Sequence, residues 1–213
     1  IHTVLETFFN EVTSNVSLLK LSENELDNLI KKHVEYALER LPKDNFKFNE
    51  KIRLVTVIHN YIELEKQRSG FEILETESTS EVNINGLKFS TRIDRMDQLE
   101  DGSKLIIDYK TGNGIKISQM IGDPIEQAQL PIYAISNSVD NVAFATINAN
   151  NCQFNSINKN KSEWVKQINE WTLSLNTSSL NFQNGIADVL PTKNACDFCE
   201  YDLLCRVDKT SNN

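Results

Sequence analysis

The sequence lacks several features that would place it in other protein classes. None of its apolar runs approaches the ~20 residues of a membrane span, and no signal peptide is visible, which argues against a membrane protein. Cysteine is scarce, with four residues, three of them near the C-terminus; this is not the framework of a secreted disulfide protein, and a cytoplasmic setting is favoured. The chain also begins with Ile1 instead of methionine, which predicts a fragment of a longer protein.

Positive charge is scarce as well. The chain has 22 lysine and arginine residues against 30 aspartate and glutamate residues, a net charge of −8. A free-standing protein that binds nucleic acid non-specifically is normally basic, so this class is disfavoured. A nuclease is not excluded, because catalytic carboxylates add negative charge and a larger parent protein can supply the basic surface. The remaining composition, 39% hydrophobic and 24% charged, is typical of a soluble globular domain.

The spacing of apolar residues predicts a single α+β or three-layer α/β/α domain over residues 1–213. We expect a helical part (1–70), a core (71–175) and a cysteine-bearing cap (190–213). The predicted helices cover residues 1–20, 22–41, 49–68, 124–137 and 162–175, the last with Trp164 and Trp171 as core residues. The predicted strands cover residues 71–77 and 81–84, two strands that end at Asp94 and Asp108, and residues 139–148 and 153–157.

The stretch from Gly86 to Lys110 indicates a function. It contains two strands that end at Asp94 and Asp108, joined by the turn signal Glu100-Asp101-Gly102, so we expect antiparallel neighbours with both carboxylates together and Lys110 beside them. Two adjacent carboxylates repel each other unless a cation or proton lies between them, and a hard ion such as Mg²⁺ fits that need. A lysine at the same point can orient water and neutralise charge on a phosphate. The stretch therefore predicts a metal-dependent phosphodiesterase.

Other acidic residues are weaker candidates. Asp97 falls in the predicted turn, where we interpret it as a surface residue or a partner of Arg95. Glu65 and Glu77 are left unassigned. Two non-catalytic interpretations also stay open. One is a DNA-binding or scaffolding module with the fold of such an enzyme but no activity, which the acidic charge favours. The other is an interaction domain in which cysteines bind zinc or an iron–sulfur cluster.

Three sequence strings occur in a specific order: G-L-K-F-S-T-R-I-D-R-M-D, D-G-x-x-x-x-I-D-Y-K-T-G and Q-x-x-x-Y. Together they resemble the PD-(D/E)XK nuclease superfamily and, more narrowly, the RecB/AddB-like nuclease domains of helicase–nuclease DNA repair proteins. The resemblance implies a restriction-endonuclease-like core, with a central mixed sheet flanked by helices. It also implies a Mg²⁺- or Mn²⁺-dependent deoxyribonuclease that acts as an exonuclease in DNA repair and recombination, beside a helicase domain or subunit.

The resemblance implies a metal site. Asp94 and Asp108 correspond to metal ligands, and the backbone carbonyl of Tyr109 corresponds to a further oxygen ligand. Lys110 corresponds to the catalytic lysine. His2, in the segment I-H-T-V-L-E, matches a histidine of an early helix that also binds the metal in the RecB-like branch.

The resemblance covers two further sets of residues. Gln129 and Tyr133, one helical turn apart, correspond to a motif that contacts the DNA strand near the scissile phosphate. Cys196, Cys199 and Cys205 resemble the last three ligands of the [4Fe–4S] cluster in iron–sulfur members of this branch, where the fourth ligand lies upstream of the early histidine. The cluster is therefore predicted for the full-length protein. Cleavage polarity, strand preference and activity of the fragment alone stay open.

Overall fold

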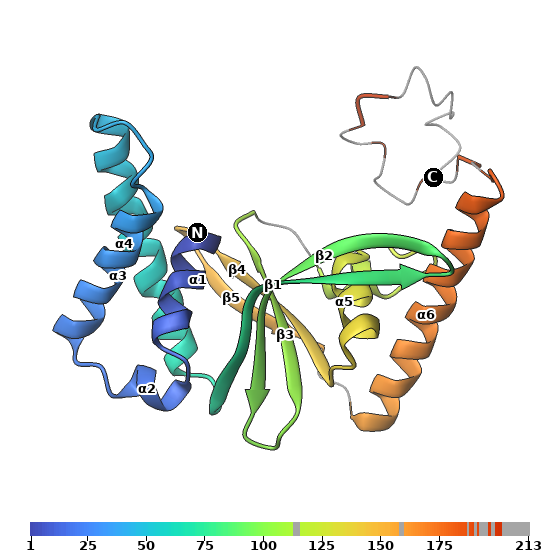
Figure 1. Cartoon of the computed structure of the whole chain (residues 1–213), viewed down its shortest axis with the longest axis horizontal. Helices are drawn as coiled ribbons and strands as arrows, with labels where there is room; N and C mark the ends of the chain where they lie inside the picture. The colour runs from blue at the N-terminus through green and yellow to red at the C-terminus, as the bar shows by residue number, and fades with distance from the viewer. Residues whose placement is uncertain are drawn as a thin grey trace.

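The computed structural model describes residues 1–112, 116–157, 160–186, 188–189, 191, 196 and 199–201. Its strands are β1 (Phe71–Ile84), β2 (Leu87–Leu99), β3 (Lys104–Lys110), β4 (Asn141–Ile147) and β5 (Cys152–Ser156). Its helices are α1 (His2–Glu11), α2 (Asn15–Leu19), α3 (Glu23–Ala37), α4 (Asn45–Lys66), the short 3-10 helix η1 (Ile117–Met120), α5 (Gln129–Asn137) and α6 (Lys161–Gln183). The predicted α+β domain with a central mixed sheet flanked by helices is confirmed (Figure 1).

The sheet has the strand order β1-β2-β3-β4-β5. Strands β3 and β4 are parallel, with Ile107 beside Ala143, whereas the other neighbours are antiparallel. Helix α5 lies in the connection between the two parallel strands, as such a crossover requires. The long β1–β2 hairpin turns at Asn85 and Gly86, whose φ angles of 48° and 86° suit the turn type that Asn-Gly favours.

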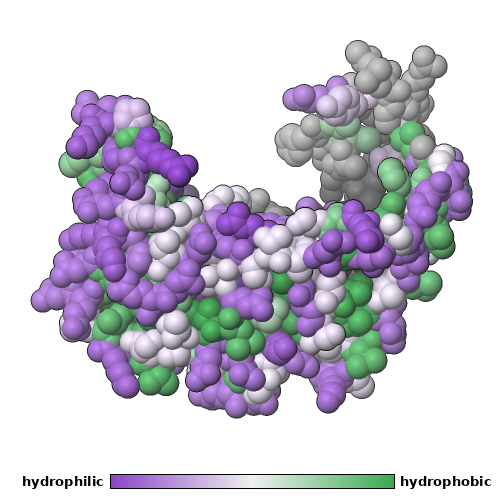
Figure 2. Space-filling view, in the orientation of Figure 1, coloured by the Kyte–Doolittle hydropathy of each residue, from purple (hydrophilic) through white to green (hydrophobic). Residues whose placement is uncertain are grey.

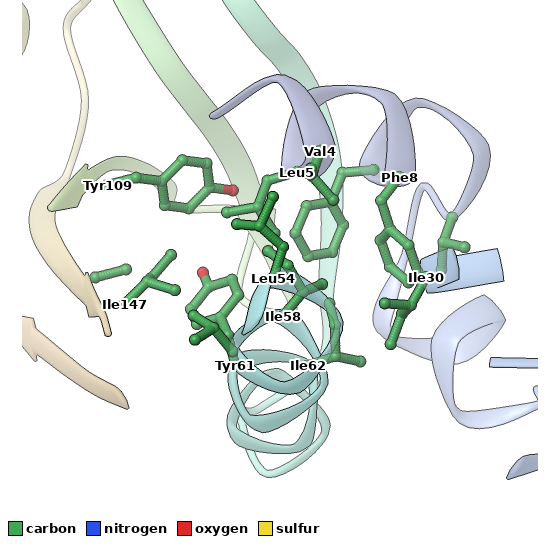
Figure 3. Close-up of a cluster of buried hydrophobic side chains, with 14 of the residues drawn as sticks. Val4, Leu5, Phe8, Ile30, Leu54, Ile58, Tyr61, Ile62, Tyr109 and Ile147 are labelled. Carbon is green, nitrogen blue, oxygen red and sulfur yellow. The ribbon is translucent and has the colours of Figure 1, made fainter. Parts of the chain in front are cut away.

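The central strands bury side chains on both faces of the sheet. Ile107 and Tyr109 of β3 pack against α1, α3 and α4 in one apolar core. Figure 3 shows this core, with Tyr109 and Ile147 of the sheet at one edge of it. Ile106 belongs to a second core with α5 and α6 on the other face. In that second core the indole nitrogens of Trp164 and Trp171 donate to the carbonyls of Val139 and Met120 at 2.8 and 2.7 Å. The sheet therefore separates two helical layers, each with its own core, and the prediction that both tryptophans are core residues is confirmed.

Several predicted elements differ from the structure, among them the helix predicted over 124–137, which begins only at Gln129. The apolar spacing over residues 1–20 hides a break, because Ser14 and Ser17 form a capping box that starts α2. The two strands predicted over 71–77 and 81–84 form the single strand β1, whose register shifts between Ile73 and Glu75. Helix α6 continues eight residues beyond 175, to Gln183.

Helices α3 and α4 extend beyond the sheet as a pair, and the N-terminus lies beside them (Figure 1). Ser22 and Glu25 form the predicted capping box of α3. Figure 2 shows a notch at the upper edge of the molecule, between the α3–α4 pair and the end of α6. None of the helices in the described part of the chain is long and apolar enough to cross a membrane.

Candidate metal-binding active site

The carboxylates of Asp94 and Asp108 are neighbours on strands β2 and β3. The antiparallel register pairs Arg95 with Ile107, so the next position places Asp94 across from Asp108. Both residues are buried, with 9% of Asp94 and 1% of Asp108 exposed. The prediction that a strand ends at Asp94 is wrong, because β2 continues to Leu99 before it turns. The two carboxylates therefore meet within the sheet.

Asp108 is the most enclosed carboxylate of this site. Its pKa is raised to about 6, chiefly by burial; the Lys110 ammonium opposes this shift and the Asp94 carboxylate adds to it. Lys110 Nζ lies 2.7 Å from Asp108 Oδ2 in an ion pair. This ammonium is the charged group that faces Oδ2, and it lowers the pKa of Asp108 against the effect of burial. A buried carboxylate is costly unless a cation is paired with it, and in this structure the Lys110 ammonium takes that place on Oδ2.

The lysine is held by a chain of hydrogen bonds that begins on α5. Lys110 Nζ donates to Gln129 Oε1 at 2.8 Å, and Gln129 Nε2 donates to the hydroxyl of Tyr133 at 3.0 Å. The Tyr133 hydroxyl donates to the carbonyl of Arg92 on β2 at 2.6 Å. The structure thus brings both residues of the Q-x-x-x-Y string to the lysine. Their contact with DNA stays a prediction.

His2, at the start of α1, reaches the same carboxylates. Its Nε2 lies 3.2 Å from Asp94 Oδ2, and its ring packs edge-on against Tyr109 at 5.9 Å between centroids. The hydrogen bond to Asp94 raises the pKa of His2, and burial opposes that shift. The backbone N–H of Tyr109 donates to the same Asp94 oxygen at 2.7 Å. Helix α1 therefore places an imidazole beside the carboxylate pair.

Glu77 is a further carboxylate of the site, and the sequence analysis left it unassigned. Its side chain is 6% exposed, and its Oε2 lies 2.6 Å from Nε of Arg92. Its Oε1 is buried and has no hydrogen-bond partner in the part of the chain that the structure describes. Burial raises the pKa of Glu77, and the charge of Asp94 raises it further. The backbone of Glu77 has a φ of 48°, which is rare for a residue with a side chain.

A sequence signal for Glu77 did exist. The hairpin register pairs Ile84 with Leu87 beside the Asn-Gly turn. The same register pairs Thr76 with Arg95 further along the hairpin, so Glu77 lies across from Asp94. Treating β1 as two separate strands removed this register, and with it the only basis for choosing Glu77.

Glu65 and Asp97 belong to a different, structural network. Glu65 is fully buried and forms ion pairs with Arg68 and Arg95 at 2.7 and 3.2 Å. Asp97 is also fully buried, and it binds Nε of Arg95 at 2.6 Å. Of its two predicted settings, the partnership with Arg95 is confirmed and the surface position is wrong. Its predicted place in a turn is also wrong, because β2 continues through it. Neither residue contacts the site carboxylates through any recorded hydrogen bond or ion pair.

The donor set fits a hard divalent cation. It offers carboxylate oxygens of Asp94, Asp108 and Glu77 and the imidazole of His2, and Glu77 Oε1 is buried without a hydrogen-bond partner among the described residues. Within residues 1–112 and the other described segments, no three such side chains lie close enough together to hold an ion as they stand. Metal binding therefore requires the side chains to converge, with the Lys110 ammonium giving up its place on Asp108.

The cysteines lie outside this site. Cys196 is half-buried and Cys199 is exposed, and both are free thiols. The backbone N–H of Cys199 donates to the carbonyl of Cys196 at 3.4 Å, so the two residues share one turn. Cys205 lies outside the described residues. The iron–sulfur or zinc site stays a prediction.

A mixed sheet that carries adjacent carboxylates and a lysine on its inner strands, with a helix in its parallel crossover, defines the restriction-endonuclease-like class. The chain belongs to the PD-(D/E)XK nuclease superfamily, whose family model matches residues 1–206. The predicted superfamily is thereby confirmed, and with it a nuclease-type hydrolase. Such nucleases typically use divalent metal ions such as Mg²⁺.

Two further comparisons add little. Sixteen chains of solved structures match the chain. One of them, the crystal structure of SSO0001, is 18% identical, with 95% of this chain and 93% of that chain covered and a TM-score of 0.36. At this score the likeness carries no argument. A search of curated proteins gave no match.

Proposed function

We propose that the chain is a metal-dependent deoxyribonuclease that hydrolyses phosphodiester bonds at the Asp94–Asp108 site. The observation that carries this proposal is the buried Asp108 carboxylate, which lies beside the charge of Asp94 and whose Oδ2 is faced by the Lys110 ammonium at 2.7 Å. A carboxylate in this state suits a cation, and the lysine next to it suits a phosphate. These are the two charges that phosphodiester hydrolysis needs at one place.

Each residue has a proposed role. Asp94, Asp108, the Tyr109 carbonyl and His2 would hold a Mg²⁺ or Mn²⁺ ion, which supplies Lewis acidity beside the scissile phosphate. Lys110 orients the attacking water and neutralises the charge that develops on the phosphate. Gln129 and Tyr133 fix the direction of the lysine, and in the Q-x-x-x-Y resemblance they also contact the strand.

The biological setting is proposed from the sequence strings. Their RecB/AddB-like order supports an exonuclease that acts on strands supplied by a helicase domain or subunit, in DNA repair and recombination. The helical part, nuclease core and cysteine-bearing cap would form one domain. The spacing of Cys196, Cys199 and Cys205 supports three of the four ligands of a [4Fe–4S] cluster.

Lys110→Ala is expected to lower cleavage by at least 10²–10³-fold, the usual cost of removing a group that stabilises charge in the transition state. We would measure degradation of end-labelled linear single- and double-stranded DNA with Mg²⁺ or Mn²⁺. The matched control is Lys104→Ala, which removes an exposed lysine from the far end of the same strand. Divalent-ion affinity, measured by calorimetry, should be unchanged in Lys104→Ala and at least as high in Lys110→Ala, because neither change removes a ligand and the second removes the ammonium that the ion must displace from Asp108.

The same assay decides between the catalytic and the silent form of the domain. Cleavage at the wild-type rate by Lys110→Ala would remove the lysine from the mechanism. A wild-type chain that binds DNA and divalent ions but never cleaves would support the alternative, a DNA-binding or scaffolding module of a helicase–nuclease complex. The net charge of −8 is the observation that favours this alternative.

Glu77→Gln is expected to weaken Mn²⁺ affinity about 10–100-fold, the range seen when a group that supports a metal site is removed. The reason is that Glu77 adds a third negative charge and an unpartnered oxygen to the site. Calorimetric titration with Mn²⁺ would measure the change. Glu81→Gln is the matched control, because Glu81 lies on the same strand and also pairs with a cation of β2, Lys88, at 3.6 Å. Equal affinities in the two variants would exclude Glu77 from the site.

A further inference from the structure

Arg92 is a strongly exposed cation next to the site carboxylates, and no role has been assigned to it so far. It lies on β2 two residues before Asp94, and 61% of its side chain is exposed. By comparison, the side chain of Lys110 is 23% exposed. A phosphate that approaches from solvent therefore finds the guanidinium of Arg92 more accessible than the lysine.

The backbone of Arg92 is fixed to the catalytic elements. Its carbonyl accepts a 2.6 Å hydrogen bond from the Tyr133 hydroxyl, and Tyr133 is linked through Gln129 to Lys110. One chain of hydrogen bonds thus sets the position of Arg92 relative to the lysine. A guanidinium on a backbone fixed in this way can bind a phosphate through two parallel N–H groups, which a lysine cannot do.

The side chain of Arg92 is engaged by Glu77. Arg92 Nε lies 2.6 Å from Glu77 Oε2, while Glu77 Oε1 is buried without a hydrogen-bond partner among the described residues. One carboxylate oxygen of Glu77 therefore binds the arginine. The other oxygen has no donor among the described residues, and Glu77 lies across from Asp94 in the hairpin. If the carboxylates share a divalent ion, Glu77 is neutralised by that ion and its hold on the guanidinium weakens.

We propose that Arg92 is the phosphate-binding residue of the site, and that its ion pair with Glu77 keeps it from a nucleic-acid strand until the carboxylates take up a divalent ion. This inference rests on the proposed function of the site. It makes strand binding and ion binding mutually favourable, because each is stronger once the other has occurred. The ligand class is the phosphodiester backbone, without base recognition, since a guanidinium on a phosphate reads no sequence.

The test measures binding and not turnover. A labelled single-stranded oligonucleotide is titrated by fluorescence anisotropy with the full chain carrying Lys110→Ala, so that the strand stays intact, with and without Mn²⁺. Arg92→Gln is then added to this background. The matched control is Lys31→Gln on α3, which also removes a cation paired with a carboxylate, Asp27, on a helix that packs against α1 and α4.

Without Mn²⁺ we expect the Arg92→Gln chain and its parent to bind the strand alike. With Mn²⁺ the parent should bind at least tenfold more tightly, the usual value of a charge-assisted hydrogen bond. The dependence of log K on log salt should also be shallower by about 0.7 in Arg92→Gln, the slope of one phosphate contact on a single strand. Arg92→Lys should restore the salt slope but only part of the affinity.

A merely structural Arg92 would give another result. If it served only to hold Glu77, its removal would change Mn²⁺ affinity and leave strand affinity and salt slope at the parent values, which would overturn the proposal. The proposal is also overturned if Arg92→Gln loses no more strand affinity than Lys31→Gln does. It is overturned as well if the parent chain does not bind the strand with Mn²⁺. If the wild-type chain never cleaves but the expected Arg92 effects on binding are observed, the proposed nuclease activity is wrong, whereas the role of Arg92 in phosphate binding is supported.

Discussion

Asp108→Asn is expected to abolish cleavage and, at the same time, to stabilise the metal-free protein at pH 7. Asp108 is 1% exposed and its pKa is about 6, above the value of 3.8 for a free aspartate. The folded protein therefore binds this proton more tightly than the unfolded chain does. The protonated carboxyl therefore contributes its full stability below pH 3.8, and this contribution is lost as the pH rises through about 6. At pH 7 the ionised carboxylate costs on the order of 2–3 kcal/mol, and asparagine removes that cost.

Urea unfolding at pH 7 and pH 5 in a metal chelator would measure this effect. The wild type should gain stability on going to pH 5, whereas Asp108→Asn should be the more stable protein at pH 7 and change less. Mn²⁺ should reverse the order, because an ion that binds only the folded wild type stabilises it by mass action. Asp101→Asn is the matched control: Asp101 is exposed in the β2–β3 turn and accepts hydrogen bonds from Ser103, which lower its pKa. A metal-free Asp108→Asn that is less stable than the wild type at pH 7 would contradict the argument.

Asp97→Asn is expected to lower the free energy of unfolding by about 3–5 kcal/mol, the cost of removing one member of a buried ion network. Arg95 is fully buried, and its Nε and Nη2 lie 2.6 and 2.8 Å from the two carboxylate oxygens of Asp97. Its guanidinium also packs 4.0 Å from the ring centre of Phe9. Arg68 binds Asp97 at 2.9 Å, so without Asp97 two guanidinium groups would share the single carboxylate of Glu65.

Guanidinium denaturation is unsuited to such an ionic network, so urea unfolding at constant salt would measure the change. Cleavage per folded molecule should stay near the wild-type rate, because Asp97 faces the α1–α4 layer and not the site. Asp101→Asn again provides an exposed reference on the same hairpin. A loss below about 1 kcal/mol, the scale of exposed ion pairs, would show that the network is not a main source of stability.

The convergence of Asp94 and Asp108 could be predicted from the sequence because a short turn fixes a hairpin register. The turn at Glu100-Asp101-Gly102 places residues 94 and 108 across from each other, whatever the flanking strands do. The prediction went wrong where strand length mattered. The interpretation of Asp97 as a turn residue is wrong because β2 continues through it, and its charge is neutralised by two arginines inside the protein.

Other features depend on contacts that no spacing reveals. The last turns of α6 carry few apolar residues, and they are held on the hairpin by polar contacts. Ser179 donates to the carbonyl of Ile84 at 3.0 Å, and Gln183 donates to the carbonyl of Asn85 at 2.7 Å. The left-handed backbone of Glu77 and its pairing with Arg92 depend on tertiary structure in the same way. The periodicity of apolar residues indicates only which positions are buried, so it predicts neither the polar contacts of α6 nor the backbone and ion pair of Glu77.

The division of the helices into two layers has a consequence for how this protein can lose activity. His2 reaches the carboxylates from the α1–α4 layer, whereas the hydrogen bonds that hold Lys110 come from the α5–α6 layer. The sheet supplies the acids, but neither layer alone supplies a complete set of partners. Local opening of either layer, short of global unfolding, is enough to dismantle the site. Its working temperature range is therefore set by whichever of the two cores loosens first.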